Sequence, residues 1–191
     1  MKNVICVFVS LLLTASAATA QTPSLEGPEH RTNTQIITFI LDFQERQIVR
    51  TAEIMPAEKY SFAPMAGAFK GVRTFGEELK HVAADNYMLG AGILGEKAPV
   101  DVGTGESGSA QVRTKDEIIR YLKDSFAYMR RAAAAIDDDN VAIATPDISP
   151  WPDGTATRLG VAVEDCVHTW DHYGQLVEYL RMNNIVPPGS K

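Results

Sequence analysis

Two of the four histidines in the chain, His168 and His172, lie four residues apart near its C-terminal end. In a helix this spacing places both imidazoles on one face, one turn apart, where they can bind a single metal ion. A catalytic site of the zinc type needs a third protein ligand and an open position. His81 lies inside another expected helix, whereas His30 lies at the start of one. The predicted metal ligands are therefore His81, His168 and His172.

The histidine pattern leaves the metal and the chemistry open. Imidazole nitrogens suit several divalent ions, and we expect zinc or nickel without choosing between them. Thr169 follows His168, so the glutamate that serves as general base in the zinc-protease motif is absent. A pair of helical histidines can also be simply solvated. The side chains expected to orient the imidazoles or to contact a substrate are Asp85, Asp165, Tyr173 and Gln175.

The segment that carries the histidine pair is predicted to be a long helix that ends near Asn183. Apolar residues recur in it at alternating spacings of four and three, the period of one helical face. These residues are Leu159, Val163, Cys166, Trp170, Tyr173, Val177 and Leu180. The histidines lie on the opposite, more polar face. If this face lines the cleft of the bundle, part of the stripe is left for a partner subunit in a two-fold dimer. The alternative is that the stripe forms the core and the histidines face outward. Cys166 belongs to the stripe and is expected to be a buried small side chain rather than a nucleophile.

Three further helices are expected before this one. The first runs from about His30 to Ile54, and Ile36, Ile40 and Phe43 are expected to widen its core face. The second and third begin at Thr74 and Thr114, because each threonine is followed three residues later by a glutamate, the signature of a capping box. No segment shows the alternation of a strand. The pattern predicts an all-α fold, a four-helix bundle in which residues 98–112 form a long crossover between helices 2 and 3.

The length and charge of the chain narrow its function class. A chain of 191 residues is typical of one domain. The net charge of −6 provides no basic patch for phosphates, so we expect no nucleic acid and instead a small-molecule partner. Residues 1–20 combine Lys2, an apolar run and the small residues Ala18-Thr19-Ala20, which is typical of a secretory signal peptide. Residues 21–29 are expected to be a flexible leader, and residues 30–191 the helical domain.

Three segments carry a resemblance to a known family. They are Val72 to Ala83 (VRTFGEELKHVA), His168 to Leu176 (HTWDHYGQL) and Leu180 to Pro188 (LRMNNIVPP). Together they are similar to the DinB family of metal-binding four-helix bundles. The resemblance implies a divalent metal held by His81, His168 and His172, a DinB-like bundle with a long crossover, and a homodimer. Characterised members of that family include thiol-dependent S-transferases and a maleylpyruvate isomerase that uses a low-molecular-weight thiol.

Two function classes follow from these observations. The first is an exported, metal-dependent enzyme, thiol S-transferase-like or hydrolase-like, that acts on a small molecule. The signal peptide departs from the family pattern, because the thiol cofactors of those enzymes are cytosolic. The second is a non-catalytic bundle that binds a metal or a small ligand, which the absence of an obvious general base favours.

The signal peptide leads to a direct prediction. Cleavage after Ala20 produces a periplasmic or secreted protein without a membrane span, because the apolar run is removed. Mass spectrometry of protein recovered from the producing cell is expected to show Gln21, or its cyclised form, at the N-terminus. Recovery of the uncleaved chain from the cytosol would contradict this prediction.

Overall fold

The computed structural model describes residues 31–146 and 156–190. The chain divides into two units after His30, and all described residues belong to the second unit. They form four α-helices: α1 (Asn33–Ile54), α2 (Phe75–Leu94), α3 (Lys115–Ala134) and α4 (Arg158–Met182). The residues described include three short 3₁₀ helices and no strand. The all-α, four-helix fold expected from the sequence is confirmed, whereas the expected signal peptide, the leader and His30 lie outside these ranges.

Every α-helix begins after a threonine. The side chains of Thr32, Thr74, Thr114 and Thr157 each accept a hydrogen bond from the backbone amide three residues ahead. At the first three starts a Gln or Glu side chain reciprocates and completes a capping box. Each such cap stabilises its helix by about 1 kcal/mol. The predicted starts of the second and third helices are therefore correct, and α1 begins slightly later than expected because Thr32 caps it.

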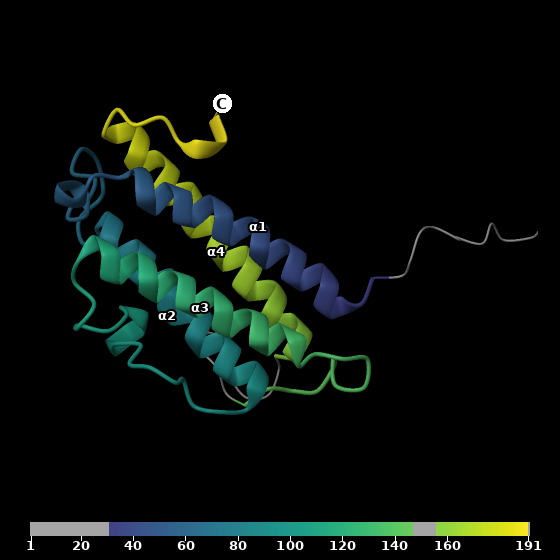
Figure 1. Ribbon diagram of the computed structural model, residues 1–191. Helices are drawn as coiled ribbons and strands as arrows, with labels where there is room; N and C mark the ends of the chain where they lie inside the picture. Colours follow the sequence, from purple (N-terminus) through teal and green to yellow (C-terminus); the bar gives the residue numbers. More distant parts are fainter. Residues whose placement is uncertain (1–30, 147–155, 191) are drawn as a thin grey trace, which may run out of the picture. The chain divides into compact units, whose positions relative to one another are not determined.

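Helices α2 and α3 lie side by side and run in the same direction (Figure 1). Near their starts, a Cβ on Gly76 would lie 3.3 Å from Ile118, and near their ends a Cβ on Gly90 would lie 2.9 Å from Tyr128. The two helices can approach this closely because glycine carries no side chain. Two parallel neighbours require the connection between them to return along the bundle, and residues 95–114 form that crossover.

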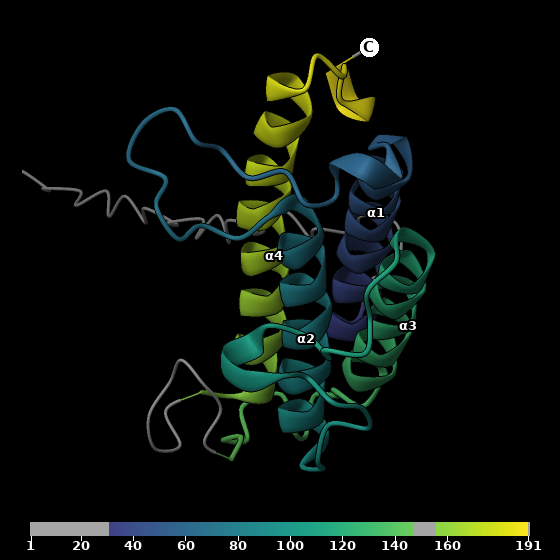
Figure 2. The same cartoon turned by 90° about the vertical axis from the view of Figure 1, so that its left-hand side faces the viewer.

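Helix α4 packs against both α2 and α1 (Figure 2). Tyr179, near the end of α4, donates a hydrogen bond to the carbonyl of Arg73, just before α2 begins. Helices α2 and α4 are therefore antiparallel, and the middle of one faces the middle of the other. Lys59, after the end of α1, reaches the carbonyl of Asn183 after the end of α4, so α1 and α4 run in the same direction.

The first three helices bury the apolar residues that recur at helical spacing along one face of each. The residues of these faces are almost completely buried: Ile37, Leu41, Ile48, Ala52, Phe75, Leu79, Val82, Leu89, Ile93, Ile118, Leu122, Phe126, Met129 and Ala133. The expected widening of the α1 face is wrong at Ile36 and Phe43, which are 48% and 42% exposed. Helix α1 packs against α3, α4 and the short 3₁₀ helix Pro188–Ser190, and Ile36 and Phe43 lie on a side of it that the described residues leave partly uncovered.

Of the two orientations left open for α4, the structure shows the one with the histidine face inside, although Cys166 and Leu180 of the apolar stripe are also buried. Val163 belongs to the apolar stripe and is 50% exposed, whereas Val161, Asp165 and His172 on the more polar face are buried. The polar face can enter the bundle because α2 provides partners for its polar groups, such as Glu78 for His172. The histidines therefore face into the bundle. None of the described helices is long and apolar enough to cross a membrane.

Exposed apolar side chains lie along the outer side of α1 and α4. They include Phe39, which is 62% exposed, and Val167, which is 57% exposed. Phe43 on α1 and Trp170 on α4 meet with ring centroids 5.6 Å apart, so the two rows adjoin. Such a patch is typical of an interaction surface. We propose that a second copy of the chain covers it in a two-fold dimer.

The dimer prediction is testable with charged substitutions. Phe39→Asp and Val167→Asp place a carboxylate in the apolar patch, and each is expected to shift the protein to a monomer in light scattering. Met65→Asp is the control, because Met65 is 91% exposed in the connection between α1 and α2. A parent protein that is monomeric at every concentration would contradict the dimer.

Candidate metal centre

The three histidines named from the sequence meet between α2 and α4. One ligand nitrogen from each of His81, His168 and His172 lies within 4.8 Å of the other two. The Nε2 atoms of His81 and His168 are 3.1 Å apart. His81 and His172 are buried, and His168 keeps 22% of its side chain exposed. The antiparallel packing of the two helices thus brings His81 into contact with two histidines that lie 87 and 91 residues later in the chain.

In two of the three imidazoles the Nδ1 atom, here called the outer nitrogen, lies within hydrogen-bond distance of an oxygen acceptor. His172 Nδ1 lies 2.6 Å from Glu78 Oε2, and His81 Nδ1 lies 2.8 Å from the carbonyl oxygen of Glu106. Both partners accept, so each Nδ1 carries the proton and donates. In the neutral ring the Nε2 atom then has a free lone pair. When they are neutral, His81 and His172 would therefore each present an unprotonated Nε2 atom, the form that binds a metal ion.

Glu106 reaches His81 from the crossover between α2 and α3. The crossover turns sharply at Gly103, Gly105 and Gly108, which have positive φ, and Glu106 itself has φ of 61°. A Cβ on Gly108 would lie 2.9 Å from Lys80 Cβ, so the absence of a side chain there lets the loop lie on α2. The loop conformation places the Glu106 carbonyl where it fixes the His81 ring.

Asp85 is a second buried carboxylate that contacts the cluster. Its Oδ2 lies 2.8 Å from His168 Nε2 and 3.6 Å from His81 Nε2. Burial lowers the pKa of His168, but the hydrogen bond and charge of Asp85 outweigh burial and raise it overall. For His81 burial dominates and lowers the pKa despite Asp85. The two rings therefore differ in electrostatic environment, and His81 is the more readily neutral ligand.

The other side chains expected near the histidines have different surroundings. Asp165 is buried, and burial raises its pKa to about 7. With the Asn86 amide turned to satisfy its neighbours, Asn86 donates to Asp165 Oδ1 at 3.1 Å. Tyr173 packs edge-on against Trp170, and Gln175 donates to Asp171 on the helix surface. Of the four expected residues, the structure brings only Asp85 into contact with the histidines.

Two residues that contact the histidines, Glu78 and Glu106, did not emerge from the sequence. Glu78 lies one turn before His81 on the buried side of α2, and a glutamate at an interior position is an unusual feature that signals a partner. Glu106 contributes a backbone carbonyl to His81, and an oxygen of its carboxylate also lies within 4.8 Å of donor atoms of His81 and Asp85. The cluster of glycines around it is the only sequence feature that marks the turn.

The donor set fits a divalent metal ion. Three imidazoles are typical ligands of zinc and related ions, and each needs its outer nitrogen held by an acceptor, as Glu78 and Glu106 do for two of them. Asp85 Oδ1 is buried and has no hydrogen-bond partner. A cation beside this carboxylate would offset the free-energy cost of burying its negative charge in a medium of low dielectric constant. A second group of donors, from His81, Asp85 and Glu106, also lies within 4.8 Å.

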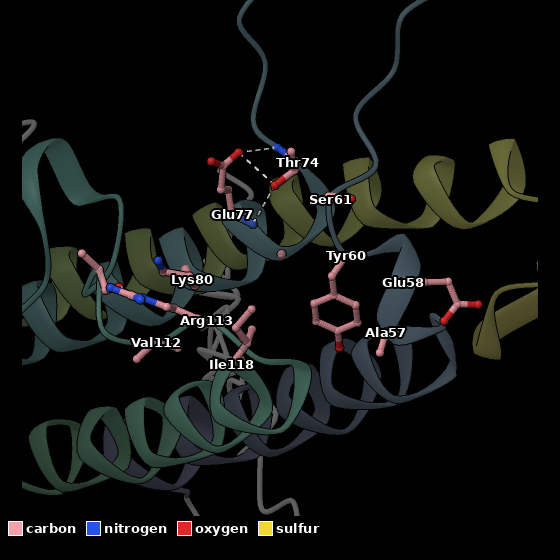
Figure 3. Close-up of a pocket in the computed structure, with 12 residues that line it drawn as sticks. Ala57, Glu58, Tyr60, Ser61, Thr74, Glu77, Lys80, Val112, Arg113 and Ile118 are labelled. Atoms are coloured by element: carbon pink, nitrogen blue, oxygen red, sulfur yellow. Dashed lines mark hydrogen bonds between the residues drawn. The ribbon is translucent and has the colours of Figure 1, made fainter.

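Two surface grooves lie beside the start of α2, and neither is lined by a histidine. The larger, with a volume of ≈ 510 Å³, is shown in Figure 3. Lys80 and Arg113 line it together with Glu58 and Glu77, so it has no consistent charge. Figure 3 also shows the Glu77 carboxylate turned to Thr74, where it serves as a helix cap. The histidine cluster is therefore the chemically distinctive site.

Cys166 is expected to be inert. The thiol is buried on α4, and burial raises its pKa to about 12. The thiolate is the reactive form, so the native protein at pH 8 is expected to leave Cys166 unmodified by iodoacetamide, whereas denatured protein reacts. Peptide mapping by mass spectrometry reads out the site. Rapid labelling of Cys166 in the native chain would contradict the buried position and reopen a nucleophilic role.

Comparisons with known proteins agree with the fold. The model of the DinB superfamily matches residues 40–176. A solved structure described as the conserved protein of locus from Enterococcus faecalis is similar, with a TM-score of 0.63 and 16% identity, over 80% of this chain and 98% of that chain. At this identity the likeness shows the fold alone. No curated protein matches the chain. The profile match spans most of the four helices, and the chain belongs to the DinB superfamily.

Proposed function

We propose that the chain is an exported metalloprotein of the DinB superfamily in which His81, His168 and His172 bind one divalent ion. The observation that carries this proposal is the meeting of three imidazoles from α2 and α4, two of them with their outer nitrogens held by Glu78 and Glu106. Zinc and nickel both suit such nitrogens. The exported location is supported by the pattern of residues 1–20.

We infer further that the centre supports a metal-dependent transferase or hydrolase reaction. A bound zinc-type ion lowers the pKa of water to about 7 or activates a thiolate. The partly exposed edge of His168 provides an approach for a small molecule. Asp85 adds a carboxylate beside His168. These features support a reaction between a small electrophile and a thiol or water.

A non-catalytic role in metal or ligand binding is the second candidate. It is supported by the enclosure of the cluster, because His81 and His172 are almost completely buried. Such a site can hold an ion without offering much room to a substrate. The two candidates differ in whether turnover accompanies the metal.

The metal assignment predicts a specific pattern of metal loss. Purified protein is expected to contain one divalent ion per chain, measured by mass spectrometry of the elements. His81→Ala, His168→Ala and His172→Ala each remove one donor nitrogen and are expected to lose the ion. His30→Ala is the matched control and is expected to keep it. Equal metal content in His81→Ala and the parent would leave only a two-histidine site and contradict the proposal.

Turnover separates the two candidate roles. The metal-loaded protein is incubated with a panel of small thiols, each with an electrophilic acceptor, and with a panel of small esters. An enzyme is expected to convert at least one substrate pair, to lose that activity with a chelator and to regain it with zinc or nickel. Metal binding without any turnover across the panels would favour the non-catalytic role.

A further inference from the structure

Asp85 occupies an unusual place relative to the histidine rings. Its Oδ2 and the Nε2 atoms of His81 and His168 form a triangle with sides of 2.8, 3.1 and 3.6 Å. Donors that lie 2.0–2.1 Å from a tetrahedral ion are separated from one another by about 3.3 Å. The three atoms therefore have nearly the spacing of three corners of one coordination tetrahedron.

The comparison with Glu78 shows why the position matters. Both carboxylates are buried, and both contact a histidine. Glu78 meets Nδ1 of His172, the outer nitrogen, and can only orient the ring. Asp85 meets Nε2 of His168, and its neighbour His81 has Nδ1 committed to Glu106. Asp85 therefore lies on the side of the rings that would face a bound ion.

The three atoms of this triangle include more hydrogen-bond acceptors than there are protons to donate to them. His81 Nε2 has a lone pair, because Nδ1 carries the proton donated to the Glu106 carbonyl. His168 Nε2 carries at most one proton, which has to serve both His81 Nε2 and Asp85 Oδ2. The second oxygen of Asp85 has no partner and is buried. Electron-rich atoms that converge with one proton among them form a site for a cation.

We propose that Asp85 is a fourth protein ligand, so that the centre has three histidines and one carboxylate. This inference rests on the proposed metal centre. It means that Asp85 occupies the position that three histidines alone would leave open. A substrate thiol or water then has to displace the carboxylate or enter as a fifth donor, as zinc sites permit. The reactivity of the centre would depend on how easily Asp85 moves.

The test compares zinc binding by the full chain and its variants in competition with a chromophoric chelator. Asp85→Asn keeps the shape of the side chain, and Asp85→Ala removes the donor altogether. Loss of a ligand is expected to weaken zinc binding more than about 100-fold, beyond the range of about 10–100-fold for groups that only orient ligands. Glu78→Gln is the comparator within that lower range. Asp171→Asn, on the exposed side of α4, is the matched control and is expected to bind like the parent.

Two readouts that do not depend on activity identify the role of Asp85. The visible spectrum of Co²⁺-loaded protein is expected to change in Asp85→Asn, because a charged oxygen donor is lost, and to stay unchanged in Glu78→Gln. A crystal structure of the zinc-loaded parent is expected to place Asp85 Oδ2 about 2.0–2.2 Å from the ion. Circular dichroism and thermal unfolding check that each variant is folded.

The outcomes separate this inference from the proposed function. A zinc-loaded parent with water between the ion and Asp85, or an Asp85→Asn variant with parental affinity and spectrum, would overturn the fourth ligand and leave the three-histidine centre intact. A parent that binds no zinc, nickel or cobalt would overturn both. Zinc binding weakened to the same extent in Asp85→Asn and Glu78→Gln, with unchanged spectra, would also overturn it, because Asp85 would then only orient His168.

Discussion

The buried contact between Glu78 and His172 is the interaction on which the rest of the site depends. It joins α2 to α4 through polar groups in the interior, where a carboxylate that is only 3% exposed requires a partner. A buried acceptor that loses its hydrogen-bond partner costs about 1–3 kcal/mol, and more when the acceptor is a carboxylate. Sliding either helix by one turn would break the contact and leave Glu78 alone. The contact therefore specifies one register between the helices, and in that register His81 meets His168.

The order of the helices provides the second constraint. Because α2 and α3 are parallel neighbours, the chain has to return along the bundle between them. The returning segment passes over His81 and provides the carbonyl of Glu106. A residue other than glycine with φ of 61° costs about 1–3 kcal/mol, and such strain is typical of functional sites. The crossover is thus part of the site as well as a connection.

The fold and part of the site were predictable from the sequence. Threonine caps and apolar periods are local signals, and they gave the starts and core faces of α2 and α3. The interior face of α4 was not predictable in this way. Its polar groups are buried because α2 provides partners for them, and Glu78 lies 94 residues from His172. The periodicity of a single helix records none of these long-range pairs.

The metal ligands were identifiable from local sequence signals, whereas the groups that hold their rings were not. The spacing of His168 and His172 and the family resemblance named three histidines, and the structure brings them together. The side chains that fix the rings depend on tertiary packing, so Glu78 and Glu106 emerged only from the structure. Tyr173 and Gln175 are close to the pair in sequence but make their contacts elsewhere, because neighbours along a helix point in different directions.

The central claim is that α2 and α4 place one nitrogen from each of His81, His168 and His172 around a single metal ion. X-ray absorption spectroscopy of the zinc-loaded chain tests it most directly, because multiple scattering from imidazole rings counts the histidine ligands. The account predicts three imidazoles with nitrogens at about 2.0–2.1 Å from the zinc and no sulfur. Two or fewer imidazoles, or a sulfur ligand from a cysteine, would contradict it.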